Sequence, residues 1–387
     1  MYSTIKTKLG VCELSFEQSN PITPFDLYLN LFYNLIMATG NYYVQRNNKN
    51  IETIERLLDE ELPSFCYDYF LAIDGQTSTL TRLNYAHDLK IFFYFLQEKK
   101  FRKSKQVKEF TLEDLESVTS NDVEYFLSYL SHYYYADKEH TCNERAKARK
   151  LSSVRAMFKF FFNKGFISVD NTAKVATPKL HEKPIIRLDK NEVFNILDIA
   201  ESGSGLTPHQ MAYHEKNKVR DSAILTLFLG TGIRISELVG LNNDDLNFKD
   251  NSFIVTRKGG SKSILYFDDA VADALKRYLE YKENGSEILE EPNALFISNN
   301  KKRITVRAVE NLVKKYAKIV SPLKKISPHK LRSTYGTQLY QATGDIYIVA
   351  DVLGHKDVNT TRKHYAAISD ENRRGVVGKV KLKRDDE

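Results

Sequence analysis

The chain has 387 residues, of which 42% are hydrophobic and 28% are charged, as is ordinary for a soluble globular protein. This length predicts two or three domains and argues against a mostly disordered chain. Lys and Arg outnumber Asp and Glu by 57 to 50, and the resulting net charge of +7 permits a polyanionic partner without establishing one.

The three cysteines, Cys12, Cys66 and Cys142, are far apart and odd in number. This usage argues against a disulfide framework and a cysteine-rich zinc site, and it favours a reducing cytoplasm. The N-terminal MYSTIKTKLG is not expected to be a secretory signal, because no basic region precedes an apolar run. The apolar stretch 27–38 is too short to span a bilayer, which takes about 20 residues.

Residues 1–60 are expected to form a helical N-terminal extension, with helices near 25–37 and 51–62. No chemical role can be assigned to them from the sequence.

A compact helical domain is predicted over 61–170. Its last helix, 143–163, places aromatic and aliphatic residues on one face and basic residues on the other. A basic face of this kind suits a phosphate backbone, although a solvated charged face is the commoner explanation for a basic helix alone. The candidate DNA-binding residues on it are Lys147, Arg149, Lys150, Arg155 and Lys159. The segment 99–108 carries six further basic residues and no acidic ones.

Residues 171–187 are predicted to be a linker, because Pro178 and Pro184 oppose helix formation there. From 188 to 387 the pattern is mixed. A helix begins after Asp189, a loop extends from about 202 to 218, and a buried helix at 223–229 ends at GTG. His209 and His214 fall in the predicted loop and are interpreted as incidental.

Short strands at 253–256 and 263–267 flank KGGSK, which indicates a β-hairpin. The segments that follow are predicted to be helical, and the chain closes with a basic tail. The expected helices are 270–281, 306–320, 327–343, 347–353 and about 359–365.

Six polar residues of the C-terminal half form a series of motifs. In chain order they are Arg234 in GTGIRISEL, Lys258 in TRKGGSK, His329 and Arg332 in SPHKLRST, His355 in LGH and Tyr365 in TTRKHYA. Each alone is more often structural, and the chain has 23 tyrosines. His329 and Arg332 share one helix face near an N-terminus, where an anion is favoured.

In this order and at these distances, the six residues resemble the tyrosine recombinase (phage integrase) family, and the flanking letters GIRISEL, HKLR and LGHKDVNTT agree. The resemblance covers about 61–370 and points to Xer-like recombinases and integrases of mobile elements. It implies a mainly α fold with a small β component. A helical SAM-like core-binding domain and a mixed α/β catalytic domain would form a C-shaped clamp on duplex DNA.

The resemblance also implies site-specific recombination through a covalent 3′-phosphotyrosine, with neither ATP nor metal. The implied roles are nucleophile for Tyr365, phosphate ligands for Arg234, Arg332 and His355, general acid for Lys258 and proton acceptor for His329. The family implies a homotetramer on two DNA sites that exchanges strands through a Holliday junction. An accessory excisionase-like or directionality factor could join it.

Three departures from the family pattern stand out: Ser333 where histidine is frequent, Asn171-Thr172 in place of Asn-Pro, and an interval from His355 to Tyr365 of ten positions in place of nine. Two alternatives stay open, a type IB topoisomerase and a DNA-binding regulator with a degenerate active site. The target sequence and the outcome, whether integration, excision, inversion or dimer resolution, are not encoded in these motifs.

Overall fold

The computed structural model describes residues 42–180, 186–257, 259–285, 289–355 and 358. The chain divides between Lys179 and Leu180 into two compact units, called here the helical unit and the mixed unit. The fold is mainly helical with a small β component, as the sequence predicted, and the strands form two small antiparallel sheets.

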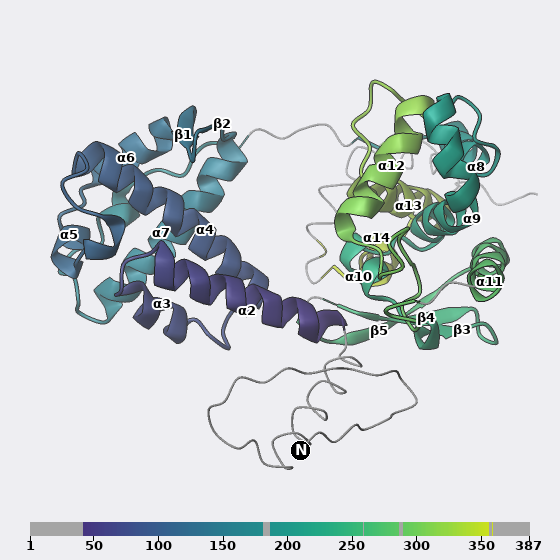
Figure 1. The fold of residues 1–387 in the computed structure, drawn as a ribbon, viewed down its shortest axis with the longest axis horizontal. Coiled ribbons are helices and arrows are strands. Elements are labelled where there is room, and N and C mark those ends of the chain that lie inside the picture. The colour runs from purple at the N-terminus through teal and green to yellow at the C-terminus, as the bar shows by residue number, and fades with distance from the viewer. Residues whose placement is uncertain (1–41, 181–185, 258, 286–288, 356–357, 359–387) are drawn as a thin grey trace, which may run out of the picture. The chain divides into compact units, whose positions relative to one another are not determined.

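The helical unit packs its helices around a phenylalanine-rich core (Figure 1). Phe92 of α4 contacts Phe126 of α6 and Phe158 of α7 edge to face, with ring centroids 5.1 and 6.1 Å apart. Its α-helices and strands are α2 (Tyr42–Glu60), α3 (Cys66–Ala72), α4 (Thr79–Phe95), α5 (Leu112–Glu116), α6 (Ser120–Tyr129), β1 (Tyr133–Tyr135), β2 (Lys138–His140) and α7 (Glu144–Asn163).

Helix α2 belongs to this core, although the predicted domain boundary at residue 61 places it in the extension. Its residues Ile54, Leu57 and Leu58 are buried in the same cluster as the α4 phenylalanines. At the other end of the unit, Thr172 and Val175 of the predicted linker are buried as well. The described core of the helical unit therefore includes residues from Ile54 to Val175.

The hairpin formed by β1 and β2 was not predicted. Tyr133 pairs with His140 and Tyr135 with Lys138, and the two turn residues Ala136 and Asp137 have φ values of +49° and +58°. A two-residue turn with both φ positive matches the twist of antiparallel strands, but it is usually marked by Asn-Gly or Asp-Gly. The sequence Ala-Asp carries no such signal.

The mixed unit places a three-stranded sheet, with order β3-β4-β5, next to α10 (Figure 1). The predicted hairpin is confirmed as β4 and β5, with Phe253 opposite Leu265. The elements are α8 (Lys190–Ser202), α9 (Pro208–Thr231), α10 (Ile235–Gly240), β3 (Leu246–Asn247), β4 (Ser252–Thr256), β5 (Lys262–Tyr266), α11 (Asp269–Glu283), α12 (Val306–Val320), α13 (Pro328–Thr343) and α14 (Ile346–Val352). The predicted helix at 359–365 lies outside the described residues.

The predicted loop over 202–218 is wrong for most of its length, because α9 begins at Pro208. Thr207 and Gln210 form a reciprocal capping box, and proline suits the first helical position. His214, interpreted as incidental, is buried on this helix, with its Nδ1 atom 3.1 Å from the Tyr316 hydroxyl. It is therefore a core residue of the mixed unit.

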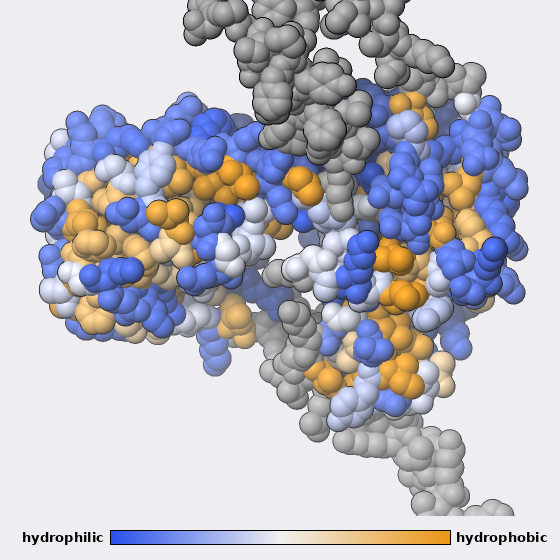
Figure 2. All heavy atoms as spheres, turned by 90° about the horizontal axis from the view of Figure 1, so that it is seen from below, coloured by the Kyte–Doolittle hydropathy of each residue, from blue (hydrophilic) through white to orange (hydrophobic). Residues whose placement is uncertain are grey.

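Figure 2 shows a surface on which hydrophilic and hydrophobic side chains are interspersed, and exposed apolar residues such as Leu71 and Phe194 occur in both units. Among the helices that the structure describes, none combines the length and the apolar character needed to cross a membrane.

Candidate active site

Arg234 lies in a turn built around Gly232, between α9 and α10. Gly232 has a φ of +62°, which ends α9, and an added Cβ would lie 2.4 Å from the Tyr335 ring. The backbone N–H of Arg234 then donates to the Glu237 carboxylate at 3.0 Å. The local sequence thus fixes the backbone of Arg234 on both sides.

The Arg234 guanidinium donates to the Glu237 carboxylate and to the Gly354 carbonyl oxygen, each at 2.8 Å. Glu237 is 2% exposed, whereas the Arg234 side chain keeps 31% of its surface exposed. A buried carboxylate fixes the orientation of the planar guanidinium and leaves part of it accessible to an anion.

Arg332 lies on α13, whose first turn carries Pro328 and His329. Arg332 is 4% exposed, and its guanidinium donates to the Gly232 carbonyl oxygen at 2.6 Å and to the Leu353 carbonyl oxygen. His329 is exposed one turn earlier on the same helix, at the spacing that places two side chains on one face.

His355 follows α14 in a turn that depends on Gly354, whose φ is +58°. The backbone N–H of His355 donates to the Ala350 carbonyl oxygen at 2.9 Å, and the residue is half-buried. The turn therefore ends the helix and presents the histidine directly after the short segment that Arg234 and Arg332 contact.

Three consecutive carbonyl groups of this segment each accept a hydrogen bond from a different arginine. Val352 accepts from Arg257 at 3.3 Å, Leu353 from Arg332, and Gly354 from Arg234 at 2.8 Å. We call residues 352–354 the arginine-bound turn. Carbonyls at a helix C-terminus lack intrahelical partners and carry the negative end of the helix dipole, which explains why cations gather there.

The electrostatics of this cluster favour an anion. It contains three guanidinium groups and one carboxylate, that of Glu237, which contacts both Arg234 and Arg257. Arginine stays charged at any relevant pH and can hold two phosphate oxygens at once. Burial raises the pKa of the neighbouring Tyr335 hydroxyl, so this tyrosine remains protonated as a packing residue.

The structure thus brings together three of the six residues predicted from the motif series: Arg234, Arg332 and His355. Lys258 and Tyr365 lie outside the described residues. Sequence reasoning missed Arg257 and Glu237, although both lie inside the quoted motifs. An arginine beside a glycine turn and a glutamate on a helix are too common to signal a role by themselves.

Helix α7 exposes only part of its predicted DNA-binding set. Lys159 is exposed, and the Arg149 side chain is 50% exposed. Lys147 donates to Ser131 at 2.6 Å and is partly exposed. Lys150, by contrast, is buried with its Nζ 2.9 Å from Asp88, and Arg155 donates to backbone carbonyls beyond α7. In this structure these two basic groups hold the helical unit together.

The basic segment 99–108 is partly neutralised by nearby acidic residues. Lys100 pairs with Asp122 and Lys105 with Asp114, each at 2.8 Å, and Lys103 contacts Glu98 at 3.1 Å. Its charge is therefore weaker at the surface than its sequence indicates.

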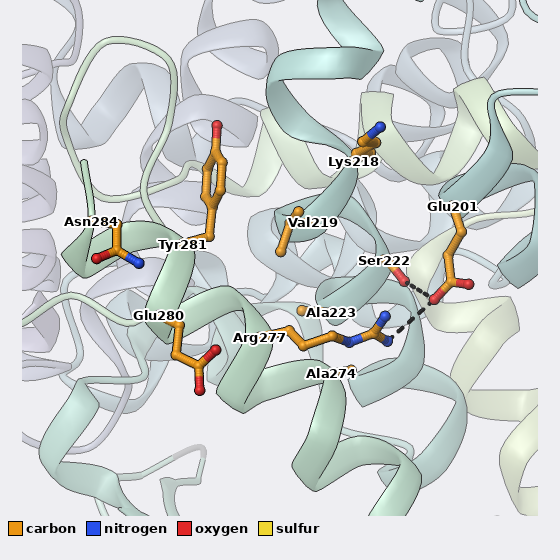
Figure 3. A pocket seen from close by; sticks show the side chains of 10 residues that line it. All are labelled: Glu201, Lys218, Val219, Ser222, Ala223, Ala274, Arg277, Glu280, Tyr281 and Asn284. Atoms are coloured by element: carbon orange, nitrogen blue, oxygen red, sulfur yellow. Dashed lines mark hydrogen bonds and ion pairs between the residues drawn. The ribbon is translucent and has the colours of Figure 1, made fainter.

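A pocket of about 410 Å³ opens between α9 and α11 and contains none of the six motif residues. Figure 3 shows Arg277 and Ser222 both directed at Glu201 on its wall. The residues that line this pocket thus include none of the arginine-bound turn.

Two family models match the chain. The phage integrase family matches residues 187–372, and the phage integrase N-terminal SAM-like domain matches residues 66–165. Tyrosine recombinase XerC of Caldanaerobacter subterraneus subsp. tengcongensis is 32% identical over 325 residues, with 81% of this chain and 85% of the relative covered. XerC of Syntrophus aciditrophicus is 31% identical, with 81% and 94% covered.

A similar fold occurs in XerH site-specific recombinase bound to palindromic difH substrate, with a TM-score of 0.58 and 16% identity over 75% of this chain and 77% of that one. The fold, the motif series and these relatives define a tyrosine-type site-specific DNA recombinase. The chain belongs to the phage integrase family.

Proposed function

We propose that this recombinase cuts and rejoins duplex DNA through a covalent 3′-phosphotyrosine on Tyr365. The observation that carries the proposal is the convergence of Arg234 and Arg332 on adjacent carbonyls directly before His355. Two guanidinium groups held this close can stabilise the charge that builds on a phosphorane-like transition state.

In the proposed reaction the Tyr365 hydroxyl oxygen bonds to phosphorus while the bond to the 5′ oxygen breaks. His329 receives the tyrosine proton, and Lys258 gives a proton to the leaving 5′ oxygen. A phosphate oxygen is a stronger acceptor than a peptide carbonyl, so the arginines can exchange part of their contacts with the turn for contacts with DNA. The phosphodiester energy is kept in the covalent bond, so neither ATP nor a metal is required.

The helical region 61–170 and the catalytic region 188–387 would close around the duplex, joined by the segment 171–187. On α7, Lys147, Arg149 and Lys159 would contact phosphates and fix the register more than read bases. Four copies would act on two sites and pass through a Holliday junction, with an accessory factor setting the direction where one is needed.

The test starts from DNA fragments that the protein binds selectively in a random library, which supply the site. The substrate is a duplex of that site with a nick next to the cleavage point. Cleavage then frees a short fragment that bears the 5′ hydroxyl, and once this fragment has diffused away the strand cannot be religated. The wild-type protein is expected to form a covalent complex on it, and Tyr365→Phe is not. No trapping by the wild type on a recovered site would contradict the proposal.

A control separates a type IB topoisomerase from a recombinase. Supercoiled plasmid without the recovered site should stay supercoiled, whereas two copies of the site should recombine. Relaxation of the plasmid without the site and of a plasmid with two copies of the site, with no recombination in either, would favour the topoisomerase.

A further inference from the structure

Arg257 occupies the point where β4 enters the hairpin turn that carries Lys258. Its backbone N–H donates to the Ser261 carbonyl oxygen at 2.7 Å, and its own carbonyl accepts from Gly260 at 3.0 Å. Gly259 and Gly260 both have positive φ values, +96° and +87°. The backbone of Arg257 is therefore fixed by the turn that contains the proposed general acid.

The Arg257 side chain reaches two other elements of the site. Its NH1 atom lies 3.2 and 3.3 Å from the two carboxylate oxygens of Glu237, and its NH2 atom lies 3.3 Å from the Val352 carbonyl oxygen. The side chain is only 10% exposed. A single guanidinium thus spans α10 and the arginine-bound turn from the base of the hairpin.

Gly354 shows how closely this guanidinium approaches the turn. A Cβ at position 354 would lie 2.8 Å from the Arg257 Cζ atom, so a larger residue there would displace the guanidinium from its present position. Glu237 in turn holds Arg234, and Gly354 accepts from Arg234 and precedes His355. Through these contacts Arg257 joins the segments that carry three proposed active-site residues.

We propose that Arg257 is a positioning residue that sets the Lys258 hairpin relative to Arg234 and His355, so that Lys258 can protonate the leaving 5′ oxygen. This inference rests on the proposed function. Arg257 itself acts through Lys258, because its side chain is almost fully buried and bonded to Glu237 and Val352. A lysine in its place could not span both acceptors in one plane.

The chemistry of the leaving group supplies a readout that a merely structural role would not change. In the normal substrate the bond from Tyr365 to phosphorus forms, the P–O5′ bond breaks, and the 5′ oxygen takes a proton. When sulfur replaces that oxygen, the P–S bond breaks and the thiolate leaves without a proton. Loss of general-acid catalysis is therefore corrected by sulfur, whereas loss of phosphate stabilisation is not.

The experiment measures single-turnover cleavage of the nicked site with oxygen or sulfur at the leaving position. Arg257→Gln and Arg257→Lys are expected to slow cleavage of the oxygen substrate about 10- to 100-fold, a loss of the size that misplacement causes. On the sulfur substrate both are expected to return to within about threefold of wild type, as general-acid loss predicts. DNA affinity should stay unchanged.

Two matched variants show which proposal fails. Lys258→Ala should be corrected by sulfur, and Arg234→Lys should remain slow on both substrates. If Lys258→Ala is corrected but both Arg257 variants are not, or if the Arg257 variants cleave at the wild-type rate, the inference about Arg257 is overturned. If Lys258→Ala is slow on both substrates, the role assigned to Lys258 is wrong, and the inference that depends on it is overturned too. Arg257→Lys retains the positive charge beside Glu237. It therefore keeps the inference testable if Arg257→Gln fails to fold.

Discussion

The buried carboxylate of Asp88 offers a quantitative test of how α7 is held. Asp88 is 0% exposed on α4 and accepts from Lys150 Nζ at 2.9 Å, from Ser153 Oγ at 2.8 Å and from Arg149. Asp88→Asn leaves the Lys150 ammonium, on a side chain that is 9% exposed, without its counter-charge. Removal of one partner of a buried ion pair costs about 3–5 kcal/mol, a large share of the 5–15 kcal/mol that stabilises a typical protein.

The assay is urea unfolding of the full-length protein. Hydrogen exchange is followed in peptides from α4 and α7, so that the unfolding of the helical unit is measured separately from that of the mixed unit. The double variant Asp88→Asn, Lys150→Met should recover at least half of the loss, because it leaves no unpaired lysine charge. A loss of less than about 1 kcal/mol in the single variant, the value typical of exposed pairs, would refute the argument that Lys150 is buried against Asp88.

Three further predictions concern DNA contact, pH and backbone conformation. In filter binding, the logarithm of DNA affinity falls linearly with the logarithm of salt concentration, and Lys159→Ala should reduce the size of that slope by about 1. Lys150→Met should leave the slope unchanged, and equal effects of the two variants would mean that both lysines contact phosphate. Burial lowers the pKa of His214, so the unfolded chain binds the proton more readily. The free energy of unfolding should fall as the pH drops below about 6.5, by at most about 1.4 kcal/mol per pH unit, and His214→Gln should reduce that dependence; an unchanged profile in this variant would assign it to other groups. Gly232→Ala should lower stability by at least about 1–3 kcal/mol in thermal unfolding, because alanine is strained at a φ of +62° and meets Tyr335; wild-type stability would show that the turn can relax.

The sequence predicted the helical elements well where hydrophobic periodicity and a capping residue coincide. Helices α12 and α13 match their predicted ranges to within a residue. Thr305 caps α12 by accepting from the Ala308 N–H, whereas the Ser327 side chain makes no capping hydrogen bond and α13 begins with Pro328, which suits a first helical turn. The first half of α9 escaped prediction because its buried side is polar: His214, Asn217 and Asp221 pack inward and form hydrogen bonds. These polar side chains belong to a buried hydrogen-bond network, and the spacing of residues in the sequence does not reveal the partners with which they bond.

The sequence predicted the identities of the candidate site residues, but it predicted few of the contacts between them. The motif series identified Arg234 and Arg332, and their separation by about a hundred residues gave no indication that both would contact one turn. Glu237 and Arg257 gain their importance only from that turn, since each joins elements that are distant in sequence. For Lys150 the sequence predicts DNA contact from its place on a basic helix, while the structure pairs its charge with Asp88 inside the helical unit.

The most direct test of the central claim is to identify the residue that bears the DNA. Covalent complexes formed on the nicked site would be digested with protease and nuclease, and the adduct would be located by mass spectrometry. The account predicts a nucleotide linked through its 3′ phosphate to Tyr365, in the peptide that follows His355. Attachment to another residue, or through a 5′ phosphate, would contradict it.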